Sequence, residues 1–136
     1  MIDVLRNRGA ERAFVFYGED GLDELTTTGP SFIYRLRDGE VTTAEFTPED
    51  FGVRRASLKD LRGGTADENV RILLDIFDGV PGPKRDIAVV NAAPVIVVAG
   101  LADGFVEAVE LANEAIDSGD ARAVLDRAIA FTKARA

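Results

Sequence analysis

The feature that most limits the fold of this chain is a run of five apolar residues at 13–17, with the sequence Ala-Phe-Val-Phe-Tyr. The run does not alternate with polar residues, so it predicts a β-strand covered on both faces, as found inside parallel or mixed sheets. A parallel neighbour needs a crossover helix, yet only one short helix, at residues 2–8, is predicted upstream. No strand that could begin a strand–helix–strand unit is therefore predicted before this one. This indicates either part of a larger domain or a chain whose sheet is completed by a partner.

A β-hairpin is predicted next. Asp38-Gly39 separates two β-rich runs, residues 32–37 and 40–46, and Asp-Gly between such runs is a strong hairpin signal. Residues 47–52 predict a turn, followed by irregular structure with Gly63-Gly64 as a flexible break.

Four helices are predicted from residue 65 onward. Thr65 and Glu68 form a capping box at the start of the first helix, and the second, residues 86–99, is apolar nearly all round and expected to be buried. Asp86 and Asp103 are the expected N-caps of the second and third helices. The other helices each have an apolar face expected to point inward: Val70, Leu73, Leu74 and Phe77; Phe105, Val109, Ala112 and Ile116; and Ala121, Val124, Leu125 and Ala128. The fold class is α/β, with a buried strand, a β-hairpin and then four helices, in a single incomplete α/β domain over residues 1–136.

The composition excludes several kinds of catalytic and metal-binding site. The chain has no Cys and no His, which excludes disulfides, thiolate nucleophiles, Cys- or His-ligated metals and the Ser-His-Asp triad. A formal charge of −8 repels a phosphate backbone and argues against nucleic acid as a partner. The longest apolar run, residues 87–101, contains Asn91 and Pro94 and is shorter than the roughly 20 residues that span a bilayer. A cytoplasmic protein with no membrane partner is expected.

The sharpest candidate site is the acidic loop, residues 19–24. It places Glu19, Asp20, Asp23 and Glu24 just past the end of the apolar strand, where ligand sites of open α/β sheets lie. Carboxylate oxygens suit a hard cation such as Mg²⁺. From spacing alone, a solvated acidic turn is favoured over a metal site.

Three other segments have a structural and a functional interpretation. Residues 61–64, Leu-Arg-Gly-Gly, could present amides and an Arg to an anion, but they lack the rest of a P-loop and favour a flexible linker. Asn91 is most simply a hydrogen-bonded Asn in the core. Residues 26–28, three threonines, could contact a phosphate, although a polar turn is the simpler interpretation.

Seven short motifs in order give the chain a resemblance to a known family. The motifs are Gly18-Glu19-Asp20-Gly21-Leu22-Asp23-Glu24-Leu25, Asp38-Gly39-Glu40, Thr47-Pro48-Glu49-Asp50-Phe51-Gly52, Leu61-Arg62-Gly63-Gly64, Glu68-Asn69, Asn91-Ala92-Ala93 and Ala115-Ile116-Asp117-Ser118-Gly119. Over essentially its whole length the sequence resembles the C-terminal portion of the anthranilate phosphoribosyltransferase family.

The resemblance implies a fold and a reaction. It implies the C-terminal part of the nucleoside phosphorylase/phosphoribosyltransferase-type α/β domain, in enzymes well over twice this length that are typically homodimers. These glycosyltransferases join anthranilate to phosphoribosyl pyrophosphate in tryptophan biosynthesis, with Mg²⁺ on the diphosphate. The family's magnesium-binding Asp-Glu pair corresponds to Asp23 and Glu24, which makes metal ligation the favoured role of these two, while Glu19 and Asp20 are expected to be solvated neighbours.

The departures from the family concern the catalytic parts. The family's glycine-rich diphosphate loop, its Lys-His-Gly segment and its anthranilate-contacting Arg lie in the N-terminal portion. None of these three features is found in this sequence. The resemblance therefore implies half of one metal site, no catalytic residue and no cofactor-binding residue here, and a chain that is inactive alone. It leaves the oligomeric state open.

Two other functions stay open. One is a non-catalytic acidic binding or interaction module that kept the scaffold. The other is a nucleoside phosphorylase, which shares the architecture but fits the Gly-Leu-Asp-Glu and Arg-Gly-Gly signals less well.

Overall fold

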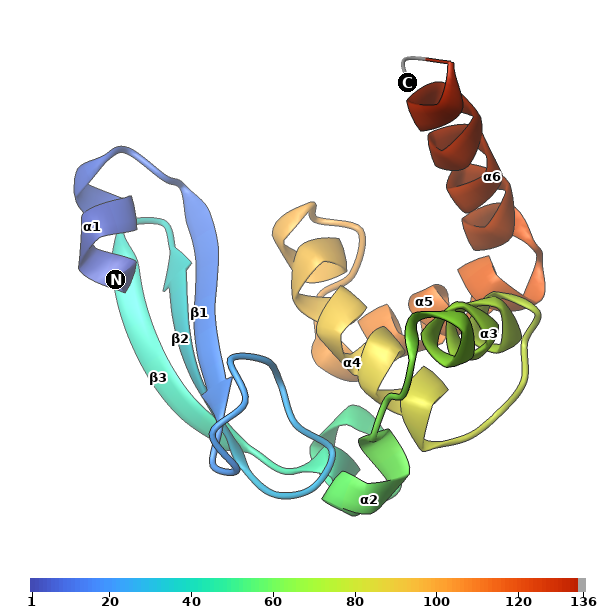
Figure 1. The fold of residues 1–136 in the computed structure, drawn as a ribbon. Helices are drawn as coiled ribbons and strands as arrows, with labels where there is room; N and C mark the ends of the chain where they lie inside the picture. Colours follow the sequence, from blue (N-terminus) through green and yellow to red (C-terminus); the bar gives the residue numbers. More distant parts are fainter. Residues whose placement is uncertain (135–136) are drawn as a thin grey trace.

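The computed structural model describes residues 1–134 as a small sheet flanked by helices (Figure 1). A short helix, α1 (Ile2–Asn7), precedes three strands, and a 3-10 turn, η1 (Pro48–Phe51), follows them. The helices come next along the chain: α2 (Leu58–Leu61), α3 (Ala66–Phe77), α4 (Pro83–Val98), α5 (Phe105–Asp117) and α6 (Asp120–Lys133). The predicted α/β class and the predicted order of strand, hairpin and helices are confirmed.

The sheet is antiparallel throughout, with strand order β1-β2-β3. β1 (Arg12–Gly18) pairs with β2 (Ser31–Arg37), and β2 pairs with β3 (Glu40–Phe46). The prediction of a parallel or mixed sheet around β1 is not met within residues 1–134, because the twelve-residue connection between Gly18 and Ser31 returns the chain beside β1 in the opposite direction without a crossover helix.

Burial on both faces of β1 is also incomplete. Phe14 and Phe16 pack against the buried core, while Tyr17, on the opposite face, is 44% exposed and stacks on Phe32 at a centroid distance of 5.2 Å. α1 lies against β1 and β2. The other edge of β1 has no strand neighbour among the described residues.

The hairpin between β2 and β3 is formed as predicted. Asp38 and Gly39 have φ angles of 52° and 81°, the positive values that a two-residue hairpin turn of right-handed twist requires. Asp38 is the only residue other than glycine with positive φ in residues 1–134. Asp-Gly was therefore a reliable signal because the turn geometry selects these residue types.

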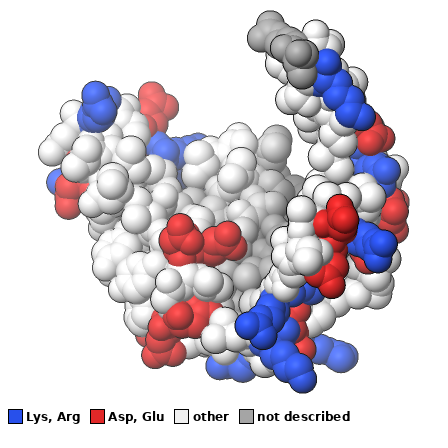
Figure 2. All heavy atoms as spheres, viewed as in Figure 1, with Lys and Arg blue, Asp and Glu red and all other residues white. Residues whose placement is uncertain are grey.

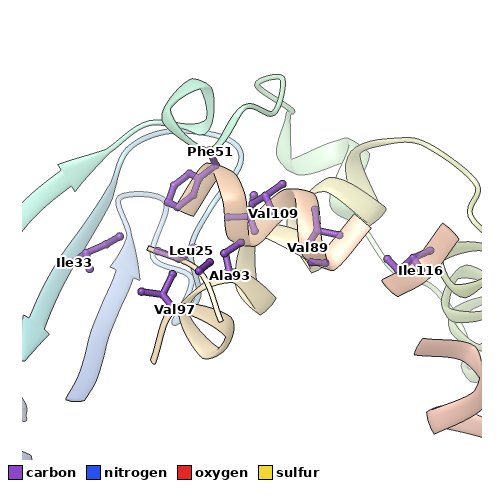
Figure 3. Packing of buried hydrophobic residues seen from close by; sticks show 12 residues of the cluster. Leu25, Ile33, Phe51, Val89, Ala93, Val97, Val109 and Ile116 are labelled. Carbon is purple, nitrogen blue, oxygen red and sulfur yellow. The ribbon is translucent and has the colours of Figure 1, made fainter. Parts of the chain in front are cut away.

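The core lies between the sheet and the pair α4 and α5 (Figure 3). The ring of Phe105, at the start of α5, has its centroid 5.1–5.4 Å from the centroids of Phe14, Phe46 and Phe51. This aromatic group joins the helices to the sheet. The face of α4 that points into the core contains the buried residues Val89, Val90, Ala93 and Val97. The expected burial of Val109, Ala112 and Ile116 is confirmed. The expected burial of α4 is met on one face only, because Val95 is 71% exposed and Ala88 is also exposed.

The predicted inward faces of α3 and α6 are only partly inward. Val70 is 53% exposed, Leu73 43% and Val124 55%, and Ala128 is exposed, whereas Leu74, Phe77, Ala121 and Leu125 are half-buried. Helical periodicity identifies an apolar face, but burial also requires an element that covers it. In the described residues α6 packs on α5 and its far end extends away from the other helices (Figure 1).

The helix starts show where capping residues were identified correctly. The capping box of α3 is confirmed: the Thr65 amide donates to the Glu68 carboxylate at 2.7 Å. The expected N-caps Asp86 and Asp103 are wrong. α4 begins three residues before Asp86, at Pro83, because proline is well suited to the first helical position, and α5 begins after Gly104.

None of the helices within residues 1–134 combines the length and the apolar character that crossing a membrane requires.

Candidate functional site

The acidic loop follows β1 and is shaped by its own aspartate. The Asp20 carboxylate accepts hydrogen bonds from the hydroxyls of Thr26 and Thr28 at 2.5 and 2.7 Å, and from the Leu22 amide at 3.2 Å. A Cβ at Gly18 would lie 2.5 Å from Asp20 Oδ1, so this close packing needs glycine. Asp20 is thus a hydrogen-bonded part of the loop, and the expectation that it is a solvated neighbour is wrong.

The same contacts change the acidity of Asp20. Burial raises the pKa of its carboxyl, but the hydrogen bonds from Thr26, Thr28 and Leu22 stabilise the ionised form and together keep the pKa below its ordinary value. The three threonines therefore form the polar turn that was the simpler interpretation, since two of their hydroxyls hold Asp20. The Thr27 hydroxyl is buried and has no hydrogen-bond partner, while the Thr27 carbonyl accepts from the Ala56 amide at 2.8 Å.

A second contact holds the other end of the loop. The Asn91 side chain, from α4, accepts from the Leu25 amide and donates to the Leu25 carbonyl, both at 2.8 Å. The Leu25 side chain is fully buried in the core (Figure 3). Asn91 is hydrogen-bonded as predicted, but its partner is the backbone directly after Glu24.

Asp23 and Glu24 lie between these two fixed points, Asp20 and Leu25. Both side chains are exposed. Two adjacent carboxylates fit Mg²⁺, which commonly binds one or two carboxylates together with waters and substrate phosphates. Within residues 1–134 no group of three or more acidic side chains is arranged to hold a metal, so these two would form part of a site.

Residues 61–64 form a defined structure rather than a free linker. The Gly64 amide donates to the Asn69 side chain at 2.9 Å, which donates back to the Gly64 carbonyl at 3.1 Å. A Cβ at Gly63 would lie 2.7 Å from Asn69 Oδ1. Lys84 at the start of α4 donates to the Arg62 carbonyl. The double glycine is therefore explained by close packing on α3.

The structure brings the acidic loop and residues 61–64 to one groove of about 620 Å³. Its lining contains three charged side chains, Glu24, Lys59 and Arg62, beside Leu22, Leu58, Leu61 and Ile87. Figure 2 shows acidic side chains over the loop after β1 and basic ones next to them over α2. The groove combines a carboxylate with two cations, which suits a ligand that carries phosphate and metal together.

A second hollow of about 630 Å³ lies between the sheet and the start of α5. Its walls are mostly apolar, including Phe14, Ile33, Phe46 and Phe105. Neither Asp23 nor Glu24 lines it, so this hollow is separate from the acidic loop.

Sequence reasoning did not identify the supporting roles of Asp20 and Asn91. A polar residue within an otherwise apolar helix was the available signal for Asn91, because a buried amide needs hydrogen-bond partners. Its partner, 66 positions away, could not be read from the sequence.

Comparison with known proteins identifies the family of this chain. Residues 1–122 match the model of the family described as "Glycosyl transferase family, a/b domain". The chain is 47% identical over 132 residues to anthranilate phosphoribosyltransferase of Rhodopseudomonas palustris strain BisA53, an alignment that covers 97% of this chain and 39% of that protein.

Two solved structures have the same fold. The crystal structure of anthranilate phosphoribosyltransferase from Thermus thermophilus aligns with a TM-score of 0.85 at 33% identity, over 96% of this chain and 38% of that one. A variant of the Saccharomyces cerevisiae enzyme with Mg bound aligns with a TM-score of 0.75 at 26% identity, over 85% and 34% of the two chains. The chain thus spans less than half the length of these relatives.

Proposed function

Since this chain belongs to the glycosyl transferase family through its a/b domain, we propose that it is the C-terminal part of an anthranilate phosphoribosyltransferase. In this proposal it acts in tryptophan biosynthesis in the cytoplasm, on phosphoribosyl pyrophosphate and anthranilate. Its contribution is a magnesium half-site. The observation that carries the proposal is the pair of exposed carboxylates, Asp23 and Glu24, in a loop held at both ends.

The residues present fit this role. Asp23 and Glu24 offer oxygen ligands, and Lys59 and Arg62 add positive charge to the groove that Glu24 lines, which favours an anionic sugar diphosphate. Mg²⁺ bound here would stabilise the negative charge on departing pyrophosphate. The amine of anthranilate then needs little help from a protein base.

We further propose that the 136 residues alone have no measurable transferase activity. Two carboxylates and a groove do not position both substrates, and the resemblance assigns the diphosphate loop and the anthranilate-contacting Arg to the N-terminal portion. The edge of β1 that has no strand neighbour among the described residues, and the exposed apolar residues of α3, offer surfaces on which such a portion can pack.

Reconstitution tests this function. The chain is mixed with a separately produced N-terminal portion of the R. palustris relative, and phosphoribosyl transfer to anthranilate is assayed with Mg²⁺. We expect activity only in the mixture, and we expect it to be lost in the double variant Asp23→Asn, Glu24→Gln. The variant Asp38→Asn, in the exposed turn between β2 and β3, is the control and should retain activity.

Other outcomes have definite meanings. No rescue at high concentration of both parts contradicts the proposal, and turnover by the chain alone contradicts the predicted inactivity. A stable monodisperse chain that shows no Mg²⁺-dependent stabilisation and no rescue favours the non-catalytic binding module.

A further inference from the structure

Asn91 makes an unusual contact for a residue in the middle of an apolar helix. Its Oδ1 accepts from the Leu25 amide and its Nδ2 donates to the Leu25 carbonyl, so one side chain satisfies both backbone groups of one residue. The same Nδ2 also donates to the Ile87 carbonyl, one turn back in α4, at 3.0 Å. That third bond fixes the amide plane relative to the helix axis.

We infer that Asn91 is a positioning residue for the carboxylates of Asp23 and Glu24. The inference rests on the proposed function, in which these two side chains ligate Mg²⁺. Leu25 follows Glu24 directly, so holding both polar backbone groups of Leu25 fixes the direction from which the Glu24 side chain leaves the chain. At the other end, the Asp20 hydrogen bonds fix the turn that leads into Asp23.

Only an amide of this length supplies the required donor and acceptor together. An aspartate would still accept from the Leu25 amide but would set a carboxylate oxygen against two carbonyls, and a leucine would leave both Leu25 groups without this partner. Partners that orient metal ligands in this way affect metal affinity although they do not touch the metal.

The experiment compares Asn91→Leu with a matched control, Asn113→Leu. Asn113 lies in α5 and, like Asn91, donates to the carbonyl one turn back, at 3.0 Å to Val109, but its other bonds go to Arg85 rather than to the loop. The 136-residue chain is used, with Mn²⁺ as the probe because it binds oxygen ligands and is detected by electron paramagnetic resonance. Hydrogen–deuterium exchange of residues 22–28 is measured in parallel, and circular dichroism verifies folding.

The expected result is a Kd for Mn²⁺ weakened about tenfold in Asn91→Leu, with faster exchange in residues 22–28. The control should lose stability but keep both the Mn²⁺ affinity and the exchange of the loop. Asn91→Asp should weaken Mn²⁺ binding too, although it adds a negative charge near the site. Unchanged affinity in Asn91→Leu, or equal loop exchange in Asn91→Leu and Asn113→Leu, would overturn the inference.

Failure of the proposed metal site is recognised separately. If the chain and its Asp23→Asn, Glu24→Gln variant bind Mn²⁺ equally, the metal role of these carboxylates is wrong. The exchange data then decide whether Asn91 positions the loop, since that measurement needs no metal. Selective acceleration in Asn91→Leu supports the positioning of residues 23–24, and its absence refutes it.

Discussion

Arg85 and Asp117 form a two-point ion pair that links α4 to the end of α5. Nη1 of Arg85 lies 2.9 Å from Oδ1 of Asp117, and Nη2 donates to Oδ2 at 2.9 Å. The guanidinium also donates to the Gly79 carbonyl at 2.8 Å and to Asn113 at 2.7 and 2.9 Å. Arg85 is 9% exposed, so its side chain joins the end of α3, the start of α4 and α5 from a buried position.

Replacing this arginine is expected to destabilise the chain. Arg85→Met keeps the apolar stem but leaves the Gly79 carbonyl and the Asn113 side chain without their donor, which costs about 2–3 kcal/mol in the free energy of unfolding. Urea denaturation followed by circular dichroism measures the change. The control is Arg122→Met, which removes exposed ion pairs with Asp78 and Asp126 and should cost less than about 1 kcal/mol. Equal losses in the two variants would contradict the role given to Arg85.

The Asp20 hydrogen bonds predict a dependence of stability on pH. Because the pKa of Asp20 is lowered in the folded protein, its ionised form stabilises the fold above the unfolded pKa of about 4, and this stabilisation is lost as the pH falls through the lower folded pKa. Asp20→Asn should therefore lower Tm at pH 7, and the difference from the unmodified chain should shrink in acid. Asp38→Asn, in the exposed hairpin turn, should change Tm little at pH 7. A gap between Asp20→Asn and the unmodified chain that stays constant down to about pH 2.5, well below the unfolded pKa, would argue against this account.

A side chain added at Gly39 in the hairpin turn is predicted to lower the free energy of unfolding through backbone strain alone. A Cβ at Gly39 would meet no atom within 4 Å, but φ is 81°, where an L side chain is disfavoured. Gly39→Ala should therefore cost about 1–2 kcal/mol. Gly29→Ala is the comparison, since φ at Gly29 is not positive and its Cβ would make an ordinary 3.5 Å contact with Glu19. Thermal unfolding of both variants checks the difference, and a neutral Gly39→Ala would show that the turn adopts another geometry.

Because the apolar face of α3 is exposed, a charged side chain introduced there is predicted to change the stability of the fold little. Leu73 is 43% exposed, so Leu73→Glu should change the unfolding free energy by less than about 1 kcal/mol. It should also reduce self-association, measured by sedimentation velocity at rising concentration. Leu74→Glu, at a half-buried position, should be clearly destabilising. A large loss of stability for Leu73→Glu would mean that this face is covered in solution.

The parts of the structure that could be predicted from sequence are those that local chemistry determines. Asp38-Gly39 specified the hairpin turn because few residues accept positive φ, and Thr65 with Glu68 specified the start of α3 because the two side chains satisfy orphan amides. The Asp-Glu pair was identified through its motif, and its exposure in a loop after a strand agrees with that interpretation.

The remainder depended on contacts between distant residues. The direction of the β1 partner was predicted wrongly, because an apolar run does not distinguish parallel from antiparallel pairing. Exposure of Val70 and Val124 was missed since periodicity does not reveal whether a covering element exists. The support given to Asp23 and Glu24 by Asn91 was missed for the same reason.

The bond between Asn91 and Leu25 also has a consequence for the order of folding. It joins residues 66 positions apart, so it cannot form until the sheet and α4 have met. Local elements such as the hairpin and the helices close short loops and form early, whereas a contact of this sequence separation waits for them. The acidic loop should therefore acquire its final backbone only in the last stage of folding, and during synthesis only after α4 has left the ribosome.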